Sequence, residues 1–112
     1  MRIDLRSIST TVLTLRDTPQ RFDNFSGDVG KNLNVVPFYG ERHPHHYVGA
    51  NISTINMYKS VRPICLTFED DSMCTEHYTP IIDVPDDADM VYLGTSAWGF
   101  KNKQSARINF DI

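Results

Sequence analysis

Short runs of apolar and β-branched residues recur along the chain, with polar stretches between them. The run at residues 10–15, TTVLTL, places apolar side chains on both faces, which is typical of a buried strand. Similar runs predict further strands at residues 33–36, 63–68, 89–94 and 105–112. Pro37 and Gly40 are expected to end the second of these strands, because both residues are typical of turns.

Helix signals lie between the predicted strands. Asp17 or Thr18 can cap a helix that begins at Pro19, where the missing N–H of proline does no harm. Phe22 and Phe25, three residues apart, would form the apolar stripe of this helix. The sequence therefore predicts a first helix directly after the first strand.

Two more helices are expected further along the chain. One covers residues 48–60, with Ile52, Ile55 and Tyr58 facing inward. A short third helix is expected from Thr79, because the proline that follows can occupy a first helical position.

The alternation of strands and helices predicts an α/β fold, a mostly parallel sheet with flanking helices in a single domain over residues 1–112. Ligands of such sheets bind beyond the carboxyl ends of the strands. The best predicted strand, within ICLTFEDD, ends there in three acids, Glu69, Asp70 and Asp71. This placement makes the acids the leading candidates for a functional site.

Two interpretations of the three acids stay open at this point. Side chains alternate along a strand, so Glu69 and Asp71 would share one side and suit Mg²⁺ or Mn²⁺. Two carboxylates about 4 Å apart repel by roughly 4 kcal/mol at an effective dielectric near 20, so a sheltered site needs a cation or a proton. Alternatively, the acids are screened by water and merely end the strand.

Composition narrows the class of protein. The chain has 112 residues, 40% of them apolar and 22% charged, as is normal for a globular domain. The net charge is −3 and no Lys/Arg run occurs, which argues against a nucleic-acid partner. Residues 1–30 contain no long apolar stretch, so we expect neither a signal peptide nor a membrane span, and a cytoplasmic location.

Cysteines and histidines give weaker signals. Cys65 is expected inside a strand as a small apolar residue, with a bridge to Cys74 as a minor alternative. His43, His45 and His46 follow no zinc-site spacing. They are expected in a polar loop that either borders the site or is simply exposed.

Five stretches in order resemble the N-terminal half of glycosyltransferase family 25, which includes lipooligosaccharide and collagen sugar transferases. They are VLTLRDTPQRFDNF, NVVPFYGE, VGANISTINMYKS, ICLTFEDD and DMVYLG, spread over residues 10–95. Gly49 and Ser53 match the third motif, and Thr54 replaces its histidine. Family members are usually much longer, so the resemblance implies a shortened Rossmann-like fold of the GT-A type.

The resemblance also implies roles for individual residues. Glu69 and Asp71 would hold the divalent cation, Mn²⁺ or Mg²⁺, and the diphosphate of a nucleotide sugar. Asp70 would contact the sugar or ribose. The remaining donor contacts would come from the first strand end and helix, namely Thr14, Leu15, Arg16 and Arg21.

The function implied is transfer of a hexose from a nucleoside diphosphate sugar to a hydroxyl of a glycan or protein acceptor. No residue can be named as the base from the sequence. Trp98 and Phe100 are either stacking platforms for a sugar or core anchors. The alternative function is a catalytically inactive remnant of the fold that works as a binding or assembly module, and a homo-oligomer is possible if apolar surface stays exposed.

Overall fold

The computed structural model describes residues 1–94. It divides into two compact units, residues 3–82 and a second unit formed by residues 1–2 with the chain from Asp83 onward. The predicted strand at residues 105–112, and both Trp98 and Phe100, lie outside the described residues.

A three-stranded parallel sheet organises the unit of residues 3–82. Strand β2 (Ser9–Thr14) lies in the middle, between β3 (Asn34–Tyr39) and β4 (Cys65–Glu69). The register pairs the last residues of β2 with the last residues of β3 and β4. The three strands therefore end at the same edge of the sheet, and the first three predicted strands and their parallel direction are confirmed.

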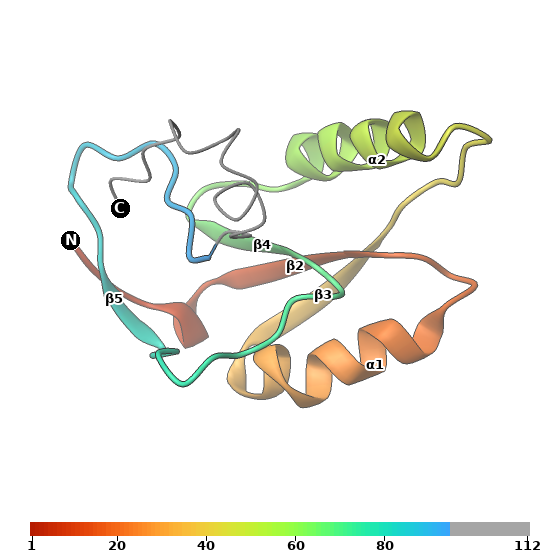
Figure 1. Cartoon of the computed structure of the whole chain (residues 1–112). Coiled ribbons are helices and arrows are strands. Elements are labelled where there is room, and N and C mark those ends of the chain that lie inside the picture. Colours follow the sequence, from red (N-terminus) through yellow and green to blue (C-terminus); the bar gives the residue numbers. More distant parts are fainter. Residues whose placement is uncertain (95–112) are drawn as a thin grey trace, which may run out of the picture. The chain divides into compact units, whose positions relative to one another are not determined.

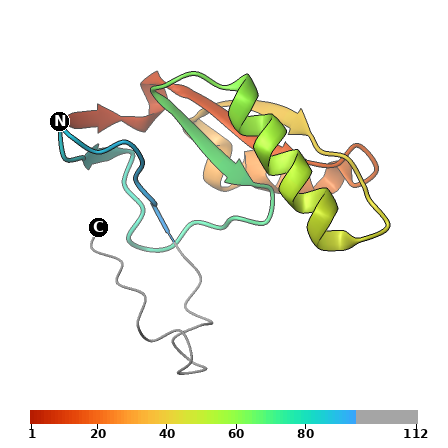
Figure 2. The ribbon, with the colours of Figure 1, turned by 90° about the horizontal axis from the view of Figure 1, so that it is seen from above.

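Two helices cover opposite faces of this sheet (Figures 1 and 2). They are α1 (Pro19–Gly27) and α2 (His46–Ser60). Two short 3₁₀ turns, η1 (Leu5–Ser7) and η2 (Val29–Asn32), complete the helical elements of the described chain. This arrangement confirms an α/β fold with flanking helices, whereas the Rossmann-like GT-A arrangement stays a prediction.

The core lies between the sheet and α1. Val12 of β2, Phe25 of α1 and Val29 of η2 are almost fully buried and form one cluster. The ring of Phe68 in β4 packs against Phe25 with ring centroids 5.3 Å apart. Phe22 also packs against this cluster, so the predicted apolar stripe of α1 is confirmed.

Helix α1 lacks the expected capping hydrogen bond from the side chain of Asp17 or Thr18. The helix begins at Pro19 as predicted and Thr18 is the N-cap residue, but the Thr18 side chain makes no capping hydrogen bond. Its hydroxyl is buried without a partner. Asp17 instead accepts a hydrogen bond of 2.7 Å from Nε of Arg42, which draws its carboxylate away from the helix.

Strand β3 does not stop at Pro37. It continues through the proline to Tyr39, three residues past the expected end at Val36. Within the described residues β3 is an edge strand. Proline is tolerated there because its missing N–H can fall on the unpaired side.

Helix α2 buries a different face from the one expected. Its buried residues are Gly49, Ser53 and Met57, one turn apart, whereas Ile52 and Ile55 are 40% and 53% exposed. Tyr58, also expected to face inward, is exposed. Gly49 and Ser53 are small, and they let the helix approach the segment after β3 (residues 40–45) closely.

The chain after β4 also differs from the prediction. No helix begins at Thr79; residues Ile81–Asp83 form β5, which pairs with β1 (Arg2–Asp4) in a two-stranded sheet. The backbone carbonyl of Pro80 accepts a hydrogen bond of 2.7 Å from the Leu5 amide, so the segment is used for pairing. The predicted strand at residues 89–94 is wrong as well, because these residues form no regular element.

The second unit contains the amino group of Met1. That group donates hydrogen bonds of 2.6 Å to the carbonyl of Val84 and to the Asp86 carboxylate. The hydrogen bond and the positive charge of the amino group lower the pKa of Asp86. Among residues 1–94, no helix has the length and apolar character needed to cross a membrane.

Candidate functional site at the carboxyl edge of the sheet

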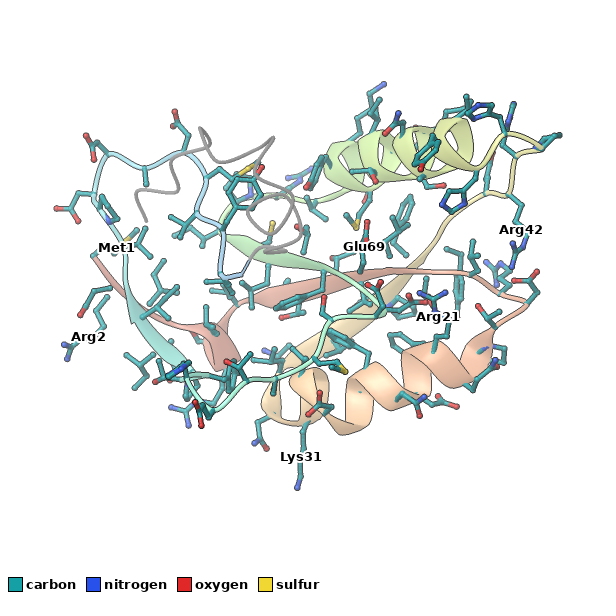
Figure 3. All side chains as sticks on the ribbon, in the orientation of Figure 1. Met1, Arg2, Arg21, Lys31, Arg42 and Glu69 are labelled. Carbon is teal, nitrogen blue, oxygen red and sulfur yellow. The ribbon has the colours of Figure 1, made fainter. Side chains whose placement is uncertain are left out.

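A groove of about 300 Å³ lies at the carboxyl edge of the parallel sheet, where β2, β3 and β4 end beside the first turns of α2. Figure 3 shows Glu69 from β4, Arg21 from α1 and Arg42 from the segment after β3 at this edge. All three residues line the groove. The sheet therefore places the acid-rich end of β4 where parallel sheets bind ligands.

Asp70 connects three elements at the floor of the groove. Its side chain is only 7% exposed, and one carboxylate oxygen lies 2.7 Å from Nη2 of Arg21 in α1. The other oxygen accepts a hydrogen bond of 2.8 Å from the hydroxyl of Thr14 at the end of β2. The Asp70 amide donates to the Leu13 carbonyl at 3.2 Å, which continues the strand pairing. Both carboxylate oxygens are thus engaged within the protein.

The outer two acids of the triplet lie in different surroundings. Glu69 is exposed and lines the groove, whereas Asp71 is exposed but does not line it. Strand β4 ends at Glu69, and a turn follows in which the Ser72 amide donates to the Glu69 carbonyl at 3.2 Å. Alternation along a strand therefore does not extend to Asp71, and the expected shared side of the two acids does not follow from it.

Within residues 1–94, no three His, Cys, Asp or Glu side chains gather as a possible metal-binding group. The oxygen donors at the groove still match the chemistry of Mg²⁺ or Mn²⁺, which bind through one or two carboxylates together with phosphate oxygens. Of the acid triplet, Glu69 has its carboxylate unpaired within residues 1–94 and lines the groove. A cation held there would take its remaining ligands from the phosphates or water.

The other predicted donor residues divide between two neighbouring hollows. Thr14, Leu15 and Arg21 line the groove together with Glu69 and Asp70. Arg16 lies in a second hollow of about 220 Å³ that Leu15 also borders. There the Arg16 guanidinium stacks over the ring of Tyr39, 4.0 Å from its centroid. The structure thus gathers four of the five predicted donor residues in one groove.

The segment after β3 (residues 40–45) borders the groove, as one of the two alternatives for its histidines predicted, whereas the part played by Glu41 was missed by sequence reasoning. The Glu41 amide donates a hydrogen bond of 2.9 Å to the hydroxyl of Ser53 in α2. A side chain on Gly40 would place its Cβ 2.9 Å from the same hydroxyl. One turn earlier, a Cβ on Gly49 would lie 3.1 Å from the His43 amide nitrogen and 3.2 Å from the Glu41 carbonyl. The two small helix residues therefore hold this segment against α2.

Two of the clustered histidines border the groove. His43 and His46 line it, whereas His45 does not. Nδ1 of His43 accepts a hydrogen bond of 2.9 Å from the His45 amide, so the neutral ring carries its proton on Nε2. Thr54, at the position of the family's histidine, does not line the groove and donates at 2.8 Å to the Ala50 carbonyl within its own helix.

Most charges at the groove are paired. Arg21 pairs with Asp70, and Arg42 pairs with Asp17 at 2.7 Å. Hydrogen bonding to Arg42 lowers the pKa of Asp17. Across the described chain, the carboxylates of Glu41 and Glu69 take part in no ion pair or hydrogen bond. These two groups are consequently available to a ligand.

Comparison with known proteins finds no matching family model, no matching curated protein and no matching solved structure. The resemblance to glycosyltransferase family 25 therefore stays a prediction from the motifs.

Proposed function

We propose that the groove binds a nucleoside diphosphate sugar together with Mn²⁺ or Mg²⁺, and that the protein transfers the hexose to a hydroxyl acceptor. The observation that carries this proposal is the placement of Glu69, a carboxylate unpaired within residues 1–94, at the carboxyl edge of a parallel sheet, in a groove that Arg21 also lines. A groove with both groups suits a cation–diphosphate ligand, because the carboxylate attracts the cation and the guanidinium attracts phosphate.

Glu69 would hold the cation, with Asp71 as the second predicted ligand on the adjoining turn. The bound cation offsets negative charge on the diphosphate leaving group. Arg21 is 47% exposed and has five N–H donors, so its pairing with Asp70 leaves donors for a phosphate. Thr14, Leu15 and Arg16 would border the base, with the Arg16–Tyr39 pair as a flat surface against which it stacks.

Asp70 has another role in this proposal than the motif suggests. One of its oxygens accepts a hydrogen bond from Thr14, and the other forms an ion pair with Arg21. Its first task is therefore to fix the end of β2 and the guanidinium of Arg21, and a contact with sugar or ribose is secondary.

The test is titration of the protein with nucleoside diphosphates by calorimetry, with and without Mn²⁺. We expect binding that requires Mn²⁺ and weakens at least tenfold in Glu69→Gln. Glu76→Gln is the matched control, because Glu76 is exposed and lies outside the groove. Absence of binding at millimolar ligand would overturn the proposal.

The same measurements separate the second candidate, a non-catalytic binding or assembly module. That function is favoured if nucleoside diphosphates bind but donor sugars are never cleaved. Product formation from a donor sugar, followed by chromatography of the released nucleoside diphosphate, would exclude it.

A further inference from the structure

We propose that Glu41 is the base that takes the proton from the acceptor hydroxyl, an inference that rests on the proposed function. Glu41 directly follows Gly40 at the carboxyl end of β3 and lines the same groove as Glu69. Its carboxylate has no ion pair or hydrogen bond within the described residues, so it is able to accept a proton.

The sheet sets the spacing between Glu41 and Glu69. Strand order β3-β2-β4 puts one strand between them, which gives a lateral spacing of roughly 10 Å. Phe38 is the β3 residue level with Glu69, so Glu41 lies a further three residues along the chain beyond that level. Glu41 therefore stands on the side of the groove opposite the predicted cation–diphosphate position.

Glu41 is held in place through its backbone. Its amide donates to the Ser53 hydroxyl at 2.9 Å, and the same hydroxyl lies 3.4 Å from its carbonyl. Gly49 adds a close approach to that carbonyl. A group that transfers protons must be held in a fixed position by its surroundings. For Glu41, contacts of its backbone with helix α2 provide this support. Because these contacts do not involve the carboxylate, replacing the side chain leaves them intact.

The other titratable groups of the groove are less suited to act as the base. Asp70 already accepts a hydrogen bond from Thr14 and forms an ion pair with Arg21. His43 accepts the His45 amide at Nδ1, so its neutral ring offers a donor at Nε2. His46 is the remaining competitor, and its substitution is part of the test.

The step is a substitution at the anomeric carbon. The acceptor oxygen forms a bond to that carbon while its proton moves to the Glu41 carboxylate. The bond between the carbon and the diphosphate oxygen breaks, and its electron pair leaves with the diphosphate. The proton on Glu41 passes to solvent, so atoms and charge balance without an oxidant or reductant.

The experiment follows cleavage of uridine and guanosine diphosphate hexoses with Mn²⁺, with water as the acceptor. We expect Glu41→Gln and Glu41→Ala to lower the cleavage rate by about 10²–10⁴-fold, the usual contribution of a general base. Nucleoside diphosphate affinity should change by less than threefold. Azide, a nucleophile with no proton to lose, should restore cleavage in Glu41→Ala and yield a glycosyl azide. Glu76→Gln should behave as the unchanged protein.

Each other outcome is decisive. The role of Glu41 would be overturned if Glu41→Gln cleaved the donor within threefold of the unchanged protein. It would also be overturned if azide failed to rescue Glu41→Ala, or if only His46→Asn lost cleavage. Donor binding by the unchanged protein without any cleavage would overturn it too, while leaving the donor site standing. Failure to bind nucleoside diphosphates would instead overturn the proposed function and this inference with it.

Discussion

Asp70 joins the ends of β2 and β4 to helix α1 through a single carboxylate. The group is 93% shielded from solvent, yet its partner Arg21 is about half exposed. A buried carboxylate needs such partners, because desolvating a charge without compensation costs several kcal/mol. Because Arg21 stays partly in water, forming this ion pair costs less desolvation than forming a fully buried one. Asp70 consequently shapes the groove before any ligand is bound.

We expect Asp70→Asn to lower the free energy of unfolding by about 1–3 kcal/mol, the cost of losing hydrogen bonds to a charged group. Thr14→Val should cost about 1 kcal/mol, because it removes only the neutral donor. Urea unfolding of both variants and of the double variant measures the coupling. Purely additive effects would contradict a shared network.

Cys74 illustrates a local effect of burial and charge on a thiol. Burial raises the pKa of Cys74, and the Asp28 carboxylate raises it further through its charge and a hydrogen bond. A raised pKa means that less thiolate is present at pH 8. Asp28→Asn removes the charge, so the pKa should fall and alkylation by iodoacetamide should become about two to ten times faster. Mass spectrometry of both cysteine peptides provides the check, with Cys65 as the internal control. An unchanged Cys74 rate would show that burial alone sets this pKa.

At the scale of elements, helix α2 packs through small side chains rather than large ones. Gly49 and Ser53 face the segment after β3, while Val48, Ile52 and Ile55 are 39%, 40% and 53% exposed. With 3.6 residues per turn, the exposed set is centred about a third of a turn away from Gly49 and Ser53, so the two sets lie on different faces of the helix. The close approach places Glu41 and His43 on the groove, so the packing of α2 and the composition of the site have one cause.

Gly49→Ala tests this packing. Its new Cβ would lie 3.0 Å from the Cβ of His43 and 3.1 Å from that residue's amide nitrogen, so the segment after β3 must shift. We expect a loss of about 1–2 kcal/mol, since overpacking exceeds the gain of up to about 1 kcal/mol from better helix propensity.

Gly27→Ala is the matched control, because a Cβ at that helix position meets nothing within 4 Å. This substitution should leave stability unchanged or raise it by up to about 1 kcal/mol. Thermal and urea unfolding measure both variants. Equal effects of the two substitutions would show that α2 does not depend on the close approach at Gly49.

Sequence patterns predicted elements better than their ends or faces. β-branched runs found β2 and β4. The expected burial of β2 on both faces is met in part, because Thr10, Val12 and Thr14 are buried whereas Thr11 and Leu13 on the other face are half-buried. Pro37 misplaced the end of β3, because an edge strand accepts a residue that a central strand would reject. The buried face of α2 is the one with the small residues Gly49 and Ser53, and a pattern based on hydrophobicity does not identify such a face. Pairing partners such as β1 and β5 are distant in sequence and leave no local sign.

At the scale of the molecule, parallel strand direction gathers residues from distant parts of the chain at one edge. Thr14, Arg21, Glu69 and Asp70 were predicted as site residues and line one groove. This much followed from the sequence, because the carboxyl ends of parallel strands meet. Glu41 was not predicted, since its place depends on how α2 packs. Asp71 was predicted beside Glu69 from the alternation of side chains along a strand, but β4 ends at Glu69, two residues before Asp71.

A ligand that bridges β4 and α1 should stabilise the whole unit of residues 3–82. At a concentration a hundred times its Kd, a ligand adds about 2.7 kcal/mol to the free energy of unfolding. For a domain of this size, that raises Tm by roughly 10 °C or more. We expect this rise with a nucleoside diphosphate and Mn²⁺ together, measured by circular dichroism. Mn²⁺ alone should raise Tm little, because residues 1–94 hold no group of three metal-binding side chains.

Glu69→Gln separates specific stabilisation from general effects of the added salts. Glu69 is exposed, so the variant should keep the Tm of the unchanged protein when no ligand is present. With nucleoside diphosphate and Mn²⁺, its rise in Tm should fall to a small fraction, because the groove would lose the carboxylate that holds the cation. Asp71→Asn should lose less, since Asp71 does not line the groove. An equal rise in Tm in all three proteins would place the bound ligand away from the carboxyl edge of the sheet.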